Sequence, residues 1–489
     1  MKQLLERYPF FLVLLPAFVT IHLEKELHQV ISYRFVYDRI VIFFAVPVLL
    51  FFIIFLFNRS SKKSAFSAFI LSLVFFYTGD LKNLLTFKFP ESIWQSYSFL
   101  MTLLIVVIAI TSYMIQRSRS DFSKQFLIIN TGLMLFIIAD FALIAFNLNK
   151  GKYELVNEID INFNPSNNVE KPDIYYLVFD TYTSSSLLQS DFSYSNKYIE
   201  TDLRNKGFII IPNSRSNYTY TSFSIGSTFN MNYIRNVDTI NKTLDRQYLQ
   251  SLKLVYSNRL ISYFENEGYS VYNHSLFDFK SHPSTIKQYD NWGFRELFDQ
   301  YNIFLKMYKE MGYHLPYWLK IILGKNKYFI NDPLIRKKND SLVNQYLLES
   351  NRLKISNPKF VYAHFIRPHS PYNIDSLGNF FEAASISKEE AYIHQIAYSN
   401  KIIKNVTDSI IANAEKPLAI IIQGDHGFPA KTPIEQNKML SNFNAVYFSN
   451  KNYKLFNDSS TNVNTFRIVL NTFFKKDLSM LPGEFYIFK

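Results

Sequence analysis

Long apolar runs dominate the first 150 residues of the chain, whereas short apolar runs alternate with polar stretches in the rest. Five long runs lie near residues 8–23, 39–57, 65–79, 97–115 and 126–147. A helix needs about 20 residues to cross the hydrocarbon core of a bilayer. The first and third runs are short, and a cleavable signal peptide would explain only the first. The pattern therefore predicts a transmembrane domain at 1–150 with about five helices.

Positive charges between the runs are unevenly distributed, and Lys and Arg accumulate in cytoplasmic loops. One side would carry Lys2, Arg7, Arg59, Lys62, Lys63, Arg117, Arg119 and Lys124. The other side would carry Lys25, Arg34, Lys82 and Lys88. This asymmetry predicts a cytoplasmic N-terminus, and five crossings would place everything after residue 150 outside the cytoplasm.

Three short apolar runs in the second part of the chain lead into residues with reactive side chains. These are Ile174 to Phe179 before Asp180, Phe360 onward through His364 to His369, and Leu418 to Ile422 before Asp425 and His426. Such runs are typical of strands buried on both faces of a parallel sheet. Helix-like segments at 243–265, 341–354 and 387–413 separate them. We predict an α/β domain over 171–489, with helices flanking the sheet, after a polar linker at 151–170.

The strand ends suggest a metal site. Ligands bind beyond the carboxyl ends of strands in open α/β sheets, and the glycines beside Asp425 and His426 permit a sharp exit and close backbone approach. Asp oxygen and His nitrogen suit a divalent cation such as zinc or manganese. Each residue also has a structural interpretation, Asp as a turn or cap residue and His364 as a core histidine. Three such strand ends together favour a site more than any one does.

Composition removes several functional classes. The chain has no Cys, which excludes disulfides, thiolate metal sites, a Cys nucleophile and a formylglycine made from Cys. Its formal net charge of +12 is scattered, and no nucleic-acid-binding motif accompanies it. We therefore expect no nucleic-acid partner. Asp140 lies in the fifth apolar run, where a carboxylate suggests either transport or helix packing. Repeated polar or broken-helix signals are missing, so an anchor is favoured over a transporter.

A hydroxyl-rich stretch, SNYTYTSFSIGSTFNMNY at 216–233, would by itself be a polar loop or cap. Its place in the motif order changes this interpretation. An Asp after the first strand, this stretch about forty residues later, a Pro-His-x-Pro segment and a late Asp-His-Gly resemble the alkaline-phosphatase superfamily. The chain resembles its membrane-anchored sulfatase-like branch, which includes phosphoethanolamine transferases and lipoteichoic acid synthases. The five N-terminal helices and the segment NVNTFRIVLNTFF at 462–474 match that branch as well.

The resemblance implies roles for individual residues. Asp180, Asp425 and His426 would be metal ligands, and Thr221 would be both a ligand and the nucleophile. The implied metal is zinc or manganese. Thr221 lies in the pattern Ser-Asn-Tyr-x-x-Thr-x-x-Ser. The identity of the nucleophile stays open, because three other hydroxyl residues lie nearby in the sequence: Thr219, Ser222 and Ser224.

Three further residues follow from the Pro-His-x-Pro region. His369 would hold the phosphate or protonate the leaving group, and His364 could serve a second metal or the phosphate. Arg367 would either contact an anionic substrate or face water.

The implied function is transfer of a phosphoethanolamine- or phosphoglycerol-like group from a phospholipid donor to a cell-surface glycan or lipid, through a phospho-Thr intermediate. The expected location is a bacterial cytoplasmic membrane. A phosphatase or phosphodiesterase of the same fold is the alternative, and a binding factor with a degenerate site is a third. Sulfate-ester hydrolysis is disfavoured, because Ser281-x-Pro283 and Ser356-x-Pro358 lack the Arg of the formylglycine pattern.

Overall fold

The computed structural model describes residues 1–27, 37–89, 92–149, 169–235, 244–286, 333–381, 386–429 and 433–488. The chain divides into two compact units, one built on Met1–Lys152 and the other on Tyr153–Asp290 and Ile330–Lys489. Nearly all of the predicted linker at 151–170 lies outside the described residues.

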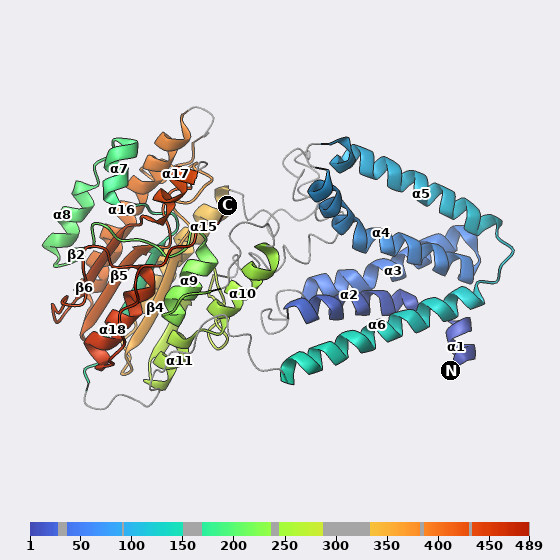
Figure 1. Ribbon diagram of the computed structural model, residues 1–489, viewed down its shortest axis with the longest axis horizontal. Helices are drawn as coiled ribbons and strands as arrows, with labels where there is room; N and C mark the ends of the chain where they lie inside the picture. Colours follow the sequence, from blue (N-terminus) through green and yellow to red (C-terminus); the bar gives the residue numbers. More distant parts are fainter. Residues whose placement is uncertain are drawn as a thin grey trace. The chain divides into compact units, whose positions relative to one another are not determined.

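The first unit is helical (Figure 1). Its described helices are α1 (Lys2–Arg7), α2 (Phe11–Leu27), α3 (Tyr37–Asn58), α4 (Ser61–Lys88), α5 (Tyr97–Arg117) and α6 (Ser123–Asn149). In the described ranges, four of these helices contain stretches long and apolar enough to cross a membrane, namely Ile40–Asn58, Ser61–Thr86, Tyr97–Arg117 and Ser123–Phe146. α2 supplies the shorter apolar stretch Phe11–Leu23. The third predicted run, at 65–79, therefore belongs to a longer membrane-length stretch in α4. The first run, at 8–23, corresponds to the short stretch in α2.

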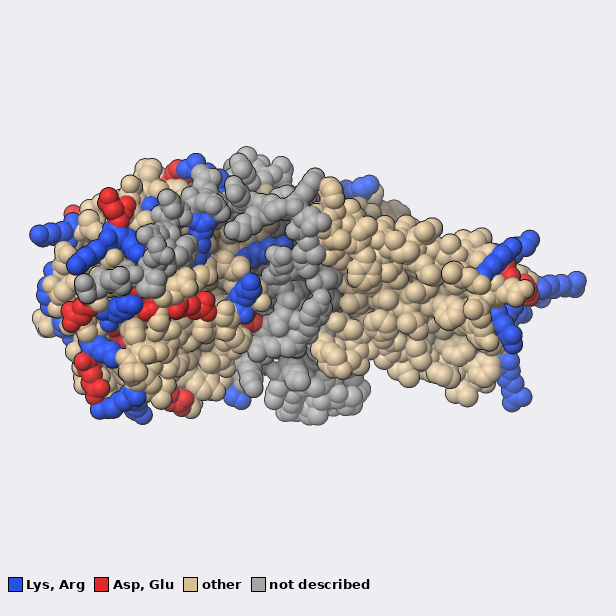
Figure 2. Space-filling model, turned by 90° about the horizontal axis from the view of Figure 1, so that it is seen from below, with Lys and Arg blue, Asp and Glu red and all other residues tan. Residues whose placement is uncertain are grey.

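The surface of this unit fits a lipid environment. Large apolar side chains point outward from α3, α5 and α6, with Phe57 87% and Ile128 70% exposed. Figure 2 shows Lys and Arg gathered at one end of the unit, beyond long uncharged sides. Lys62 Nζ donates to Ser123 Oγ at 2.7 Å, and Lys63 Nζ donates to the Gln116 carbonyl at 2.7 Å. Two loops that the charge pattern assigned to the same side thus lie together.

Asp140 joins two helices of the unit. Its buried carboxylate lies 2.9 Å from His22 Nδ1 and 3.0 Å from Lys25 Nζ, both on α2. An ionic contact between α2 and α6 fits the packing interpretation of this residue.

The second unit contains a six-stranded sheet in the order β2-β6-β5-β1-β4-β3 (Figure 1). The strands are β1 (Asp173–Phe179), β2 (Ile209–Ile210), β3 (Ser270–His274), β4 (Lys359–Phe365), β5 (Leu418–Gly424) and β6 (Asn444–Phe448). β5, β1, β4 and β3 run parallel, whereas β6 is antiparallel to β5 and β2 to β6. Every residue of β1, β4 and β5 is buried, as their continuous apolar sequences predict.

The described helices of this unit are α7 (Ser185–Phe192), α8 (Lys197–Asn205), α9 (Thr221–Asn230), α10 (Leu244–Tyr256), α11 (Arg259–Asn266), α15 (Pro333–Arg352), α16 (Lys388–Ala412), α17 (Pro433–Gln436) and α18 (Thr465–Phe474). The predicted helix at 243–265 is two helices, because the Asn258 side chain accepts a hydrogen bond from Ile261 N and begins α11. The hydroxyl-rich stretch also differs from a loop, since it contains α9, whose ten residues are all buried.

Candidate active site at the edge of the sheet

Three predicted metal ligands meet at the carboxyl ends of β1 and β5. Phe179 and Gly424 are paired across these strands, so Asp180 and Asp425 leave the sheet side by side. One ligand atom from each of Asp180, Asp425 and His426 lies within 4.8 Å of the others, and all three residues are buried. His426 Nε2 is 3.6 Å from Asp425 Oδ2 and 4.0 Å from Asp180 Oδ1. We call these three residues the Asp-Asp-His cluster.

Hydrogen bonds orient the cluster for a cation. Asp425 Oδ1 accepts from the backbone N–H of Thr181 and of His426, both at 2.9 Å. Its Oδ2 is buried and has no hydrogen-bond partner in the described part of the chain. A buried carboxylate oxygen without a partner is costly, and a metal ion would satisfy it. His426 Nδ1 lies 2.9 Å from the Gly427 carbonyl, which leaves Nε2 directed at the two carboxylates. The residues therefore fit a divalent cation.

The charge state of Asp425 supports this fit. Burial raises the pKa of Asp425, but the imidazoles of His426 and His364 and the Thr181 N–H outweigh burial, so that the pKa lies below its usual range. The carboxylate is consequently charged at neutral pH and available as a ligand.

Thr221 is the first residue of α9, and its Oγ1 lies 3.5 Å from His426 Nε2. The first N–H groups of a helix lack intrahelical partners and favour anions. The structure thus places a hydroxyl, three candidate ligands and an anion-binding helix end together.

The neighbouring hydroxyls have other partners. Thr219 Oγ1 accepts from Phe488 N at 3.0 Å, Ser222 Oγ from Ser251 Oγ at 2.6 Å, and Ser224 Oγ donates to the Asp425 carbonyl at 2.7 Å. Of the four hydroxyls weighed from the sequence, Thr221 is the one beside a side chain of the Asp-Asp-His cluster. The geometry favours it as the nucleophile.

His364 lies within β4 and is fully buried. Its Nδ1 is 2.7 Å from the Tyr362 hydroxyl, and its Nε2 has no hydrogen-bond partner among the described residues. Burial lowers the pKa of His364 to about 4, so the imidazole is neutral at pH 7. A neutral imidazole next to the cluster can serve either a second metal or a phosphate, and both alternatives stay open.

The segment after β4 carries His369 and Arg367. His369 Nδ1 lies 2.6 Å from the Ser370 carbonyl, and the residue is partly buried. Arg367 is 2% exposed and forms an ion pair with Asp340 of α15. The expectation that Arg367 could face water is therefore wrong. Its charge is neutralised inside the protein, where Asp340 also accepts from Ile366 N at 2.9 Å.

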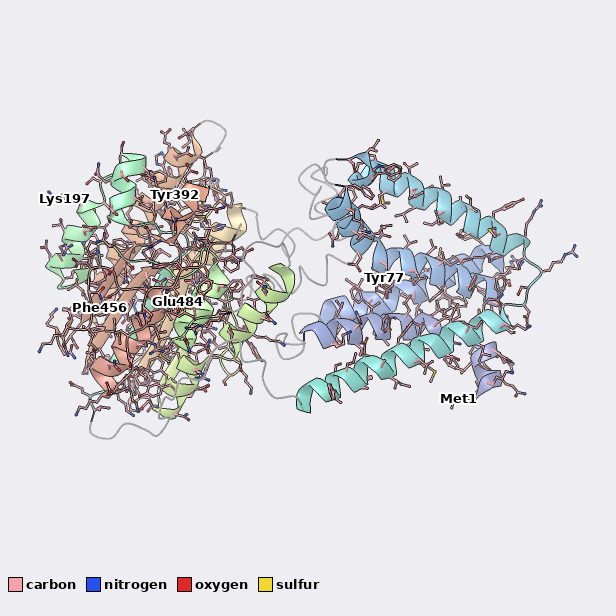
Figure 3. The ribbon with its side chains drawn as sticks, in the orientation of Figure 1. Met1, Tyr77, Lys197, Tyr392, Phe456 and Glu484 are labelled. Carbon is pink, nitrogen blue, oxygen red and sulfur yellow. The ribbon has the colours of Figure 1, made fainter. Side chains whose placement is uncertain are left out.

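Several supporting residues were not identified from the sequence. Thr181 has a left-handed backbone with φ of 62°, which is strained for a β-branched residue, and its N–H reaches Asp425. The Tyr392 hydroxyl (labelled in Figure 3) donates to the Thr181 carbonyl at 2.8 Å. The side-chain amides of Asn442 and Asn462 both donate to the Gly424 carbonyl. The Asn-rich runs SNFN and NVN were the available signal.

The glycines flanking Asp425 and His426 are required by close approach. A Cβ on Gly424 would collide with the Tyr182 carbonyl, and one on Gly427 with the Ser441 carbonyl. Neither has the left-handed φ that would call for glycine by itself. The predicted close backbone approach is confirmed.

A family model described as Sulfatase matches residues 172–473. This covers more than half of the chain, and the chain belongs to the sulfatase family. The resemblance to the alkaline-phosphatase superfamily predicted from the four motifs is confirmed, and the chain has the fold of a phosphoryl-transfer or hydrolytic enzyme.

Three solved structures illustrate what the chain is similar to. The integral membrane lipooligosaccharide phosphoethanolamine transferase A from Neisseria meningitidis is 13% identical, with 96% of this chain and 95% of that one covered and a TM-score of 0.39. The C-terminal periplasmic domain of EptC from Escherichia coli, in complex with Zn, is 11% identical over 63% and 85%, with a TM-score of 0.39. A Vibrio parahaemolyticus protein of the alkaline phosphatase superfamily is 12% identical over 65% and 71%, with a TM-score of 0.40. No curated protein matches.

Proposed function

We propose that this protein is a membrane-anchored, metal-dependent transferase that moves a phosphoethanolamine- or phosphoglycerol-like group from a phospholipid to a cell-surface glycan or lipid. The observation that carries the proposal is the Thr221 hydroxyl, at the start of the buried helix α9 and 3.5 Å from His426 Nε2 in the Asp-Asp-His cluster. Four helices with the length and composition of membrane spans supply access to a lipid donor.

Zinc or manganese would be held by Asp180, Asp425, His426 and the Thr221 hydroxyl. When bound, such an ion lowers the pKa of the hydroxyl and neutralises charge on the phosphoryl oxygens. Asp425 contributes a carboxylate that is already charged at neutral pH. The Gly427 carbonyl holds His426 in the orientation needed for the same role.

The transfer has two steps. In the first, the Thr221 hydroxyl loses its proton to solvent and Oγ attacks the donor phosphorus; the bond from phosphorus to the diacylglycerol oxygen breaks, and that oxygen takes a proton, for which His369 is the proposed donor. The N–H groups at the start of α9 stabilise charge on the phosphoryl oxygens. In the second, an acceptor hydroxyl gives its proton to His369 and attacks the phospho-Thr; the bond from phosphorus to Thr221 Oγ breaks, and Oγ takes up a proton from solvent.

Sulfate-ester hydrolysis is not the favoured activity, although the family bears that name. Formylglycine chemistry needs an oxidised Cys or Ser in a Cys/Ser-x-Pro-x-Arg pattern, which the chain lacks. The proposed location is the cytoplasmic membrane of a bacterial cell, with the N-terminus in the cytoplasm and the catalytic unit in the periplasm or outside the cell.

Diacylglycerol release from labelled phospholipids tests the first step. Membranes with the native protein should release diacylglycerol, and Thr221→Ala should reduce the rate at least about a thousandfold because the nucleophile is lost. Thr221→Ser should retain measurable activity, because the hydroxyl is kept. A chelator should abolish diacylglycerol release by the native protein. Thr219→Ala is the matched control, because this hydroxyl faces Phe488 N and not the cluster.

Two results would separate the alternatives. Release that persists in Thr221→Ala would remove Thr221 from the mechanism. If folded, metal-loaded protein releases no diacylglycerol from any phospholipid, the lipid-donor proposal is refuted. A hydrolase acting on another phosphoester would then be favoured.

A further inference from the structure

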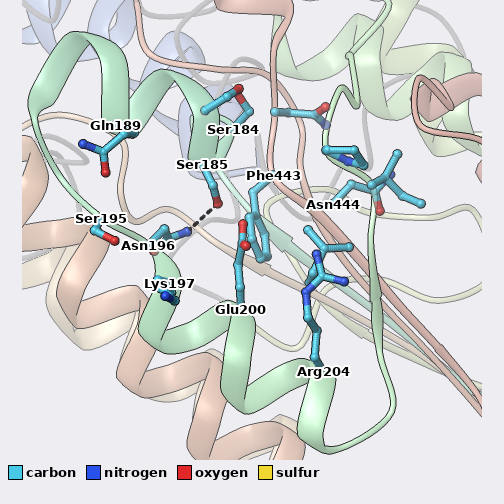
Figure 4. Close-up of a pocket in the computed structure, with 15 residues that line it drawn as sticks. Ser184, Ser185, Gln189, Ser195, Asn196, Lys197, Glu200, Arg204, Phe443 and Asn444 are labelled. Carbon is cyan, nitrogen blue, oxygen red and sulfur yellow. Dashed lines mark hydrogen bonds between the residues drawn. The ribbon is translucent and has the colours of Figure 1, made fainter.

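A pocket of about 300 Å³ with a mixed polar and apolar lining (Figure 4) lies next to the candidate active site. Its walls come from α7, α8, the end of β2 and the start of β6. Residues on both sides of the pocket are close to the candidate active site, in sequence or through a hydrogen bond. Ser184, on the α7 side, follows Asp180 by four residues, and Asn442, on the β6 side, donates to the carbonyl of Gly424, which precedes Asp425.

Backbone hydrogen bonds connect the pocket wall to the end of β5, the strand that precedes Asp425. Gly424 N donates to the Phe443 carbonyl at 2.9 Å, and Phe443 N donates to the Tyr182 carbonyl at 2.9 Å. Phe443 lines the pocket, whereas Tyr182 lies two residues after Asp180. A molecule in the pocket would therefore lie one strand away from the Asp-Asp-His cluster.

The lining suits a ligand with many hydroxyl groups. Hydroxyls and amides line one part of the space, where Ser185 Oγ accepts from Asn196 Nδ2 at 3.0 Å (dashed line in Figure 4). Glu200 and Arg204, one turn apart on α8, rise toward the same space from below. Such a surface offers donors and acceptors in several directions, and the lining residues Ile210, Ile211, Pro212 and Phe443 add an apolar wall against which the face of a sugar ring can pack.

Asn444, a lining residue, has a buried acceptor atom that no group in the described part of the chain contacts by a hydrogen bond. Asn444 is 2% exposed, its Nδ2 donates to Ser214 Oγ at 3.1 Å, and its Oδ1 has no hydrogen-bond partner among the described residues. An amide oxygen buried without a partner is unfavourable. This oxygen is itself shielded from solvent, so the pocket wall would have to shift for a ligand hydroxyl to reach it.

We infer that this pocket binds one saccharide unit of the acceptor glycan. The inference rests on the proposed function, which needs a second substrate beside Thr221. The volume is at the small end of ligand pockets and suits a single sugar ring better than a lipid or a peptide. The exposed Arg204 side chain adds a preference for a sugar that carries a carboxylate or phosphate.

The experiment blocks the pocket from its rim. Gln189 is an exposed lining residue of α7, so Gln189→Trp should fill the entrance without disturbing the core. Ser190→Trp, at the next exposed position of the same helix and outside the lining, is the matched control. Glucose, N-acetylglucosamine and glucuronic acid serve as probes, with binding to the full-length protein followed by ligand-observed NMR.

We expect at least one sugar to bind the native protein, and Gln189→Trp to weaken that binding about tenfold or more. Arg204→Ala should weaken glucuronic acid more than glucose. Ser190→Trp, which lies outside the lining, should bind the sugars and release diacylglycerol as the native protein does. Equal binding by the two Trp variants, or no binding by the native protein, would overturn the inference.

The two proposals fail in different ways. If diacylglycerol release depends on Thr221 but no sugar binds, the saccharide site is refuted and the proposed enzymatic function is supported. If Gln189→Trp blocks sugar binding but the native protein releases no diacylglycerol, the saccharide site is supported and the proposal of a lipid donor is refuted.

Discussion

At the scale of single residues, the two oxygens of Asp425 have different tasks. Oδ1 accepts two backbone N–H groups and holds the end of β5 in place, while Oδ2 is buried with no hydrogen-bond partner in the described ranges. The residue therefore combines a structural contact with an oxygen that is available to a cation, and a substitution can separate the two.

Asp425→Asn keeps an amide oxygen for the two N–H groups and removes the charge. We expect a folded protein whose metal affinity falls by more than about a hundredfold, since even the loss of a partner behind a ligand costs 10- to 100-fold. Metal content by mass spectrometry, together with thermal melting, measures this. Asp408→Asn, a partly exposed position on α16, is the control. Full metal content in Asp425→Asn would show that this carboxylate is not a ligand.

At the scale of elements, β3 depends on a buried histidine. His274 ends this strand, with Nδ1 2.7 Å from Thr285 Oγ1 and Nε2 2.7 Å from Ser350 Oγ on α15. Burial lowers the pKa of His274 to about 4, below the ordinary value of 6.5. Between these values the unfolded chain binds more protons than the folded one, so the stabilising contribution is present above pH 6.5 and is lost as the pH falls towards 4.

The expected loss is at most roughly 3 kcal/mol for His274, from a pKa difference of about 2.5. His274→Gln should reduce the drop in melting temperature between pH 7.5 and pH 5, because glutamine does not titrate. Part of the drop should remain, since burial also lowers the pKa of His364 to about 4. Thermal melting of the full-length protein at several pH values is the measurement, with His394→Gln as control. An unchanged pH profile would contradict the prediction.

At the scale of the whole molecule, the charge distribution predicts how the chain crosses the membrane. The start of α4 contacts the end of α5 and the start of α6 through Lys62 and Lys63, and Lys and Arg gather at one end of the helical unit (Figure 2). Because Lys and Arg prefer the cytoplasmic side, we predict that this end faces the cytoplasm and that the chain after α6 continues outside it.

The absence of Cys makes this orientation testable with single-cysteine variants. A membrane-impermeant maleimide should label Ser459→Cys, an exposed position in the catalytic unit, in cells whose cytoplasmic membrane is intact. Ser120→Cys, exposed between α5 and α6, should react only after this membrane is permeabilised. The native protein, which has no thiol, controls for background. Labelling of both variants without permeabilisation would refute the predicted orientation.

The sequence by itself was sufficient for the features that depend on local pattern. Continuous apolar runs must be buried, so β1, β4 and β5 and the long helices of the first unit could be located from the sequence. Because the carboxyl ends of parallel strands meet at one edge, the proximity of Asp180, Asp425 and His426 could also be expected.

Tertiary structure decided what local pattern does not contain. α9 mixes Ser, Thr and Gly with apolar residues and has no clear helical period, and its helix lies buried among other segments. Thr221 is distinguished from Thr219, Ser222 and Ser224 by the partners that distant segments supply to each hydroxyl. The mixed sheet and the pocket beside β6 likewise arise from contacts between residues far apart in the chain, because burial and hydrogen bonding are properties of the packed fold.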